Sequence, residues 1–132
     1  MIREDYVSFE TAKLLKEKEF DEPCHALYHN GEDKIFFGLD VDSYYNSILN
    51  VDCYTCPTLQ MAMKWLREVY NIGVFPSIYG ITDRDGTIES YPYGTDIVNL
   101  QTHELICGDI LPKDTYEEAC ETAIKYVLEN LV

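Results

Sequence analysis

Residues 57–73 read PTLQMAMKWLREVYNIG, and this stretch carries the clearest structural signal in the chain. Its apolar residues recur at spacings of three and four, as in a helix that buries one face. They are Leu59, Ala62, Met63, Leu66, Val69 and Tyr70. Pro57 suits the first helical position with Cys56 as the capping residue, and Asn71 and Gly73 suit a helix end. The stretch predicts a central helix that begins at Pro57.

Two short runs before this helix predict a β-hairpin. Cys24–His29 and Lys34–Gly38 lie on either side of His29–Glu32, which contains an Asn-Gly turn. An Asn-Gly pair between apolar runs is a strong hairpin signal. Ser47–Val51 is a candidate for a third strand.

The region after the central helix predicts a second sheet. Val74–Thr82 and Thr87–Tyr91 flank the turn-like segment Asp83–Gly86. Pro76 lacks a backbone N–H, so it is expected on an edge strand or among the first residues of its strand. Glu104–Ile110 is a further strand candidate.

Two more helices are expected near the ends of the chain. Ser8 is a favoured N-cap for a helix at about Phe9–Lys18. Thr115 and Glu118 have the spacing of a capping box at the start of the last helix. That helix has an apolar stripe formed by Tyr116, Ala119, Cys120, Ala123, Ile124, Val127, Leu128 and Leu131.

These elements predict a single α+β domain over residues 1–132. An N-terminal helix is followed by two β-rich units, each ending in a helix, with antiparallel sheets whose helices pack on one face. Ala62–Glu68 and Ala123–Glu129 resemble each other, which suggests an internal duplication of about 23–70 and 74–131. The strand order is left open.

Composition limits the functional classes. The chain has 24 acidic and 10 basic residues and a formal net charge of −14. This charge repels nucleic-acid backbone and anionic membranes, so neither is an expected partner. No signal peptide, membrane span or paired cysteine framework is recognisable, and the five cysteines favour reduced thiols in the cytoplasm.

Three segments resemble known sequences. They are Glu4–Lys18 (EDYVSFETAKLLKEK), Pro57–Glu68 (PTLQMAMKWLRE) and Thr115–Cys120 (TYEEAC). They look like those of a family of small uncharacterised proteins of gut Bacteroidetes and their phages or mobile elements. The resemblance covers about a third of the chain and implies a bacterial or phage context. It implies no activity, cofactor or catalytic residue.

Cys53 and Cys56 form the motif with the most chemical character. A Cys-x-x-Cys pair at a helix start can favour a thiolate, and the pair could also supply half of a zinc site. The motif is thus a candidate for a thiol-dependent enzyme or a metal site. The other cysteines and histidines lack the spacing of a second ligand pair, so no catalytic, cofactor-binding or metal residue is assigned.

Five tyrosines fall in predicted loops or strand ends, where they are candidates for contact with a partner. They are Tyr44, Tyr45, Tyr54, Tyr91 and Tyr93. Tyrosine combines apolar area with a polar hydroxyl and is enriched at interfaces. The segment Tyr91–Gly94 is expected to be an exposed surface segment.

The leading hypothesis is a non-catalytic accessory protein that binds a protein partner of basic or mixed charge. It assumes no cofactor and leaves the oligomeric state open. The alternatives are the thiol or metal chemistry at Cys53 and Cys56, and a small-ligand binder for which no specific residue can be named.

Overall fold

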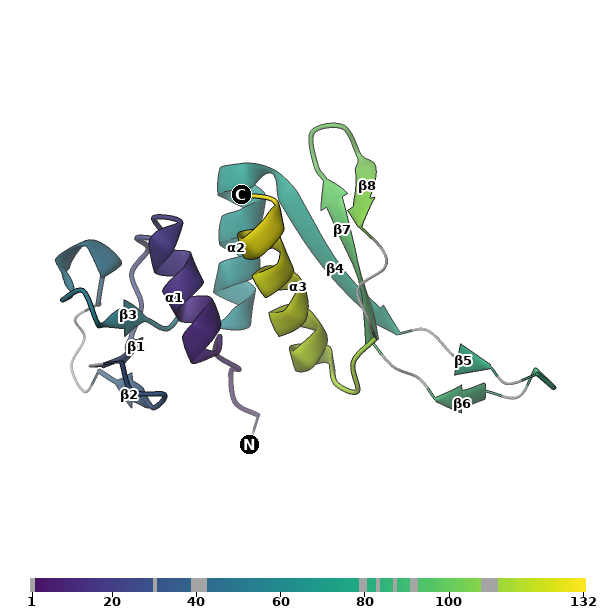
Figure 1. The fold of residues 1–132 in the computed structure, drawn as a ribbon, viewed down its shortest axis with the longest axis horizontal. Coiled ribbons are helices and arrows are strands. Elements are labelled where there is room, and N and C mark those ends of the chain that lie inside the picture. The colour runs from purple at the N-terminus through teal and green to yellow at the C-terminus, as the bar shows by residue number, and fades with distance from the viewer. Residues whose placement is uncertain are drawn as a thin grey trace. The chain divides into compact units, whose positions relative to one another are not determined.

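The computed structural model describes residues 2–29, 31–38, 43–78, 81–82, 84–86, 88–90, 93–107 and 112–132. Over these residues the chain has the predicted α+β composition, with an N-terminal helix and antiparallel sheets (Figure 1). In chain order the elements are α1 (Phe9–Glu17), β1 (Ala26–Tyr28), β2 (Ile35–Phe37), the 3-10 helix η1 (Asn46–Ile48), β3 (Tyr54–Thr55), α2 (Leu59–Tyr70), β4 (Ile72–Ile78), β5 (Ile81–Thr82), β6 (Ile88–Ser90), β7 (Tyr93–Asn99), β8 (Glu104–Cys107) and α3 (Tyr116–Asn130).

The chain divides into two compact units. The first comprises residues 1–62 and 127–132, and the second comprises residues 63–126. The division falls within α2 and within α3. The predicted duplication would divide the chain differently, at about residues 70–74, and it stays a prediction.

In the first unit, α1 lies against the sheet β2-β1-β3 (Figure 1). The hydroxyl oxygen of Ser8 accepts a hydrogen bond from the Thr11 N–H at 3.2 Å, which confirms Ser8 as the N-cap. The Phe9 ring then meets Tyr28 and Tyr54 edge-on, at centroid distances of 5.5 and 5.6 Å. Tyr28 and Tyr54 are paired across β1 and β3, so one face of the sheet receives the helix.

The predicted hairpin before α2 is confirmed, but the predicted strand Ser47–Val51 is wrong. β1 and β2 pair antiparallel from Ala26–Phe37 to Tyr28–Ile35. Asn46–Ile48 instead forms the 3-10 helix, and the third strand is β3, Tyr54–Thr55. The reason is the Asn46 side chain, whose long-range hydrogen bonds hold this stretch in a turn.

α2 begins two residues later than predicted. The Thr58 hydroxyl accepts a hydrogen bond from the Met61 N–H at 3.1 Å, so Thr58 has the capping role expected of Cys56. The predicted face is buried at Leu59, Ala62, Met63 and Leu66, whereas Val69 is 53% exposed and Trp65 is buried in addition. Asn71 has the positive φ of 56° that a helix C-terminus favours.

The second unit is built on the sheet β4-β7-β8. β4 and β7 pair in an unbroken register from Ile72–Asn99 to Ile78–Tyr93. The predicted hairpin is confirmed by β5 and β6, whose pair Ile81–Ser90 keeps that register. Pro76 lies on the edge strand β4, as its missing N–H requires.

β7 itself was not predicted, and part of the Tyr91–Gly94 expectation is wrong. Tyr93 opens this strand and is half-buried, and Gly94 is buried, whereas Tyr91 lies outside the described residues. β7 is the central strand between β4 and β8, and Gly94 near its start pairs with Ser77 of β4 despite the weak strand propensity of glycine.

α3 covers one face of this sheet, which we call the inner face. The Thr115 hydroxyl accepts a hydrogen bond from the Glu118 N–H at 3.1 Å, so the predicted cap is confirmed. The Thr95 hydroxyl donates to the Ala119 carbonyl at 3.4 Å, which ties β7 to the helix. The predicted stripe of α3 is buried at Ala119, Cys120, Ala123, Ile124, Val127 and Leu128.

Candidate interaction surface

Cys53 and Cys56 are both buried, at 3% and 1% exposure, and carry thiols rather than a disulfide. Cys56 precedes the N-cap Thr58 by two residues, so its thiol is not at the helix start. Its sulfur lies 3.4 Å from the Val7 carbonyl oxygen. A buried thiol off the helix terminus lacks both the access and the electrostatic field that reactive cysteines need.

Two other thiols, those of Cys24 and Cys120, favour their neutral form. Burial raises the pKa of Cys24 and of Cys120 to about 11, and nearby carboxylates add to the effect. In the part of the chain that the structure describes, no three His, Cys, Asp or Glu side chains gather in a way that could hold a metal ion. No helix of that part is long and apolar enough to cross a membrane.

The described tyrosines of the predicted set mostly serve internal packing. Tyr44 exchanges two backbone hydrogen bonds with Cys24, at 3.0 and 2.7 Å. Tyr54 packs against Phe9, and Tyr93 meets Tyr116 edge-on at 6.0 Å. Tyr45, at 38% exposure, is the most solvent-accessible of those that can be described.

Residues 45–52, which we call the 45–52 loop, are fixed by the buried side chain of Asn46. Its amide nitrogen donates to the Phe20 carbonyl at 2.8 Å, and its amide oxygen accepts from the Thr55 N–H at 2.9 Å. Asn46 is only 5% exposed, so water cannot replace these bonds without rearrangement. One side chain thereby ties the loop both to the end of α1 and to β3.

Two charged side chains add further ties to this loop. The Asp21 carboxylate accepts a hydrogen bond from the Ser47 N–H at 2.8 Å. The Lys16 ammonium group donates to the carbonyls of Asn50 and Cys53, at 2.8 and 2.7 Å, and lies 5.4 Å from the centroid of the Tyr54 ring. The loop backbone is therefore held along its length.

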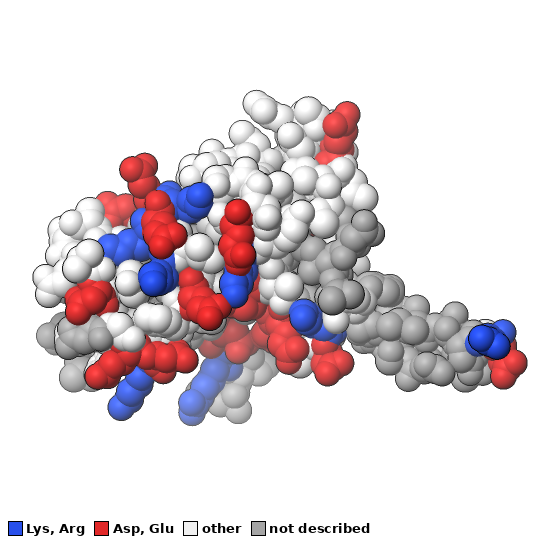
Figure 2. All heavy atoms as spheres, viewed as in Figure 1, with Lys and Arg blue, Asp and Glu red and all other residues white. Residues whose placement is uncertain are grey.

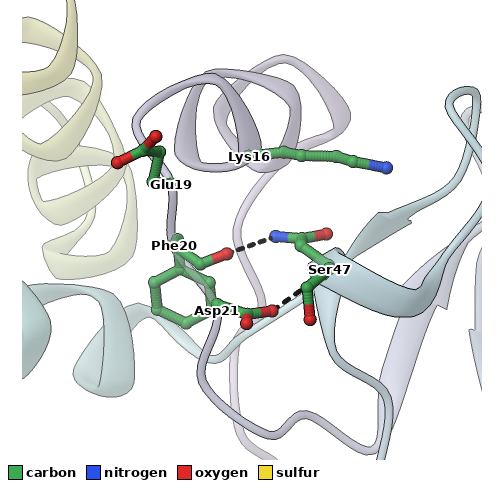
Figure 3. Close-up of a pocket in the computed structure, with 6 residues that line it drawn as sticks. Lys16, Glu19, Phe20, Asp21 and Ser47 are labelled. Carbon is green, nitrogen blue, oxygen red and sulfur yellow. Dashed lines mark hydrogen bonds between the residues drawn. The ribbon is translucent and has the colours of Figure 1, made fainter.

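A hollow of about 350 Å³ lies between the end of α1 and this loop (Figure 3). It is lined by Lys16, Glu19, Phe20, Asp21, Asn46 and Ser47. In Figure 3 the hydrogen bonds of Asn46 and Asp21 cross from one wall to the other. The volume is at the lower end for a ligand pocket, and its polar groups already bind one another. These polar groups therefore hold the 45–52 loop in place, and the hollow is poorly suited to binding a small molecule.

The 45–52 loop presents apolar side chains to solvent. Ile48 is 73% exposed, Val51 is 87% exposed and Tyr45 lies beside them in sequence. Exposed apolar side chains that cluster on one short segment are typical of binding surfaces. The sequence did not reveal them, because Ser47–Val51 was a candidate for a strand. Asn46, two positions before Ile48, is the residue that could have indicated a turn here.

The charge around the loop is acidic without forming a single acidic patch. Three acidic residues in or near the 45–52 loop are exposed: Glu19, Asp21 and Asp52. On the face shown in Figure 2, the described acidic side chains lie among lysines and arginines over the first unit. A partner's basic groups would therefore meet separate carboxylates at the loop's border.

Neither a protein-family model, a curated protein nor a solved structure matches this chain significantly.

Proposed function

We propose that this chain is a non-catalytic accessory protein that binds a protein partner through the 45–52 loop. The observation that carries the proposal is the exposure of Ile48 and Val51 on a loop whose backbone is fixed by Asn46, Asp21 and Lys16. A loop that is rigid before binding loses little conformational entropy in the complex. Its apolar side chains can therefore contribute their full burial to affinity.

The partner's chemistry follows from the loop and its border. Ile48 and Val51 require an apolar pocket, and the exposed carboxylates of Asp21 and Asp52 favour a basic rim around it. The net charge of −14 favours a protein over a nucleic acid as this partner. A cytoplasmic protein of a bacterium or phage is the context that we propose, and it rests on the sequence resemblance and the reduced thiols.

Quantitative affinity capture tests the proposal. The immobilised chain is compared with an Ile48→Ser, Val51→Ser double variant in a bacterial lysate at low salt, and retained proteins are quantified by mass spectrometry. We expect at least one protein to be held by the wild type and to fall about tenfold with the double variant.

Met61→Ser is the matched control, because Met61 is a 38% exposed apolar residue outside the loop. It should retain the same protein as the wild type. Equal retention by the double variant would contradict the proposal, and so would an equal loss with the control. Far-UV circular dichroism verifies that all three chains are folded.

A further inference from the structure

The sheet β4-β7-β8 has a second face, opposite α3, which we call the outer face. Val74 and Ile97 are paired across β4 and β7 and are buried, so they lie on the inner face. The next pair, Phe75 and Asp96, points the other way, because side chains alternate along a strand. Both side chains are exposed, so this face of β4 and β7 is open to solvent at these two positions.

β8 extends the outer face. Leu105 pairs with Val98, two positions from Asp96 on β7, and Leu105 is 60% exposed. A register shift follows, so that Cys107 pairs with Ile97 on the inner face. A hydrogen bond with the Cys107 thiol raises the pKa of Tyr126 on α3, which agrees with this assignment of faces. The apolar part of the outer face thus runs over all three strands.

Gly73 allows a compact apolar cluster on this face. A Cβ atom at Gly73 would lie 2.5 Å from Cε2 of Phe75 and 2.9 Å from Cδ2 of Leu100. The Phe75 ring and the Leu100 side chain therefore approach each other directly above the Gly73 backbone. Phe75 nevertheless remains 47% exposed, so the cluster is not covered.

Asp96 places a charge on the outer face. It lies on the central strand, directly opposite Phe75, and is exposed. Among the residues with described positions, none forms a hydrogen bond or ion pair with the Asp96 side chain. A carboxylate between apolar side chains favours a partner that places one cationic group there. A second copy of the chain is disfavoured, since two chains of charge −14 repel each other.

We propose that the outer face binds one amphipathic helix of a partner protein. The helix covers Phe75, Val98 and Leu105 with an apolar stripe and places a lysine or arginine on Asp96. A three-stranded sheet is about 14 Å wide at roughly 4.8 Å per strand, which suits a helix about 10 Å across. The bound helix would complete a helix–sheet–helix sandwich whose other helix is α3. This surface is separate from the 45–52 loop and does not depend on it.

Peptide binding to the full chain tests this proposal. The probe is a fluorescein-labelled 18-residue peptide of leucine and lysine, with leucine at positions i, i+3, i+4 and i+7 of each turn pair. Its control is an isomer of equal composition whose leucines are scattered around the helix. Fluorescence anisotropy should show about tenfold tighter binding of the amphipathic peptide. Amide NMR shifts should concentrate on residues 73–75, 96–98 and 105.

Variants locate the site. Phe75→Ser and Leu105→Ser should each weaken peptide binding about fivefold or more, and Asp96→Asn should weaken it and reduce its salt dependence. Val69→Ser and Asp114→Asn are the matched controls, since both residues are exposed and lie outside the outer face; they should leave binding unchanged. The same variants should not affect partner capture by the 45–52 loop.

Three results would overturn the proposal. Equal binding of both peptides would show bulk attraction to an acidic chain, and no binding would exclude a helical partner of this composition. A dimer that is abolished by Phe75→Ser in sedimentation analysis would assign the outer face to a second copy instead.

Discussion

In the first unit, side-chain hydrogen bonds fix an irregular loop, whereas in the second unit backbone hydrogen bonds between paired strands fix the sheet. Asn46, Asp21 and Lys16 reach from other segments to fix the 45–52 loop. β4 and β7, in contrast, keep one register over seven consecutive pairs. A single substitution can release the loop, but a ladder distributes its stabilisation over many equivalent bonds. The comparison predicts that polar substitutions affect the first unit more strongly.

Asn46→Ala should have the largest effect. It leaves the Phe20 carbonyl and the Thr55 N–H buried without their partner, which should cost about 3 kcal/mol of unfolding free energy. Asn99→Ala is the matched control in the second unit. The Asn99 side chain likewise makes two hydrogen bonds to the backbone, both as acceptor. The turn is exposed and water can replace them, so the cost should stay below about 1 kcal/mol. Urea titrations measure both, and equal losses would break the comparison.

Each unit contains a buried thiol whose pKa is raised, Cys24 in the first and Cys120 in the second, so alkaline pH should destabilise both units. Folding raises the pKa of the Cys24 thiol from 9.0 to about 11, so the folded state favours the neutral thiol. The resulting stabilisation is complete below pH 9 and is lost as pH rises toward 11. Between pH 8 and pH 10.5 the wild type should lose about 2 kcal/mol more than Cys24→Ala.

The measurement is the unfolding free energy under reducing conditions at the two pH values. Cys120→Ala should flatten the pH dependence in the same direction, because the pKa of Cys120 is also raised to about 11. Identical slopes in wild type and variants would show that neither thiol is protected from ionisation.

Lys16→Met sharpens the comparison within the first unit. It removes the donor for Asn50 and Cys53 but keeps the aliphatic stem, so it should cost about 1.5 kcal/mol. Hydrogen exchange at the loop amides should accelerate. Lys13→Met on the same helix is the control, since Lys13 is exposed, and it should change stability by less than about 0.5 kcal/mol. Equal effects would mean that Lys16 does not hold the loop.

Gly73→Ala tests the second unit with the smallest expected effect. The new methyl group displaces the ring of Phe75 and the end of Leu100, at a cost of about 1 kcal/mol, because both side chains can shift. In a Phe75→Ala background the same change should be milder. Thermal unfolding of the four chains in this double-mutant cycle gives the coupling, and strict additivity would refute the close approach.

The helices and hairpins could be predicted because their signals are local. Ser8 and Thr115 cap helices through bonds to residues three positions away, and turn residues set the hairpins. The 45–52 loop could not be predicted, since Asn46 acts through Phe20, which lies 26 positions away. Tertiary contacts of this range override the strand propensity of Ile48 and Val51.

The candidate surface was less predictable than the fold. Tyrosines in loops were the expected contacts, yet Tyr54 and Tyr93 pack against other aromatic rings. Exposure of an apolar residue depends on what covers it, and composition cannot show that. β7 could not be predicted for a related reason. Gly94 and Asp96 have low strand propensity and weaken the strand signal of the sequence, and the segment is a strand because it pairs with β4 and β8.

The division of the chain into units has a consequence for synthesis. Residues 127–132 belong to the same unit as residues 1–62, and the Lys18 ammonium group donates to the Val132 carbonyl at 2.8 Å. The second unit is therefore nested within the first along the chain. A growing polypeptide emerges from its N-terminal end, so the second unit has all of its residues before the first one does. We expect the unit that begins earlier to finish folding later, after its last six residues have left the ribosome.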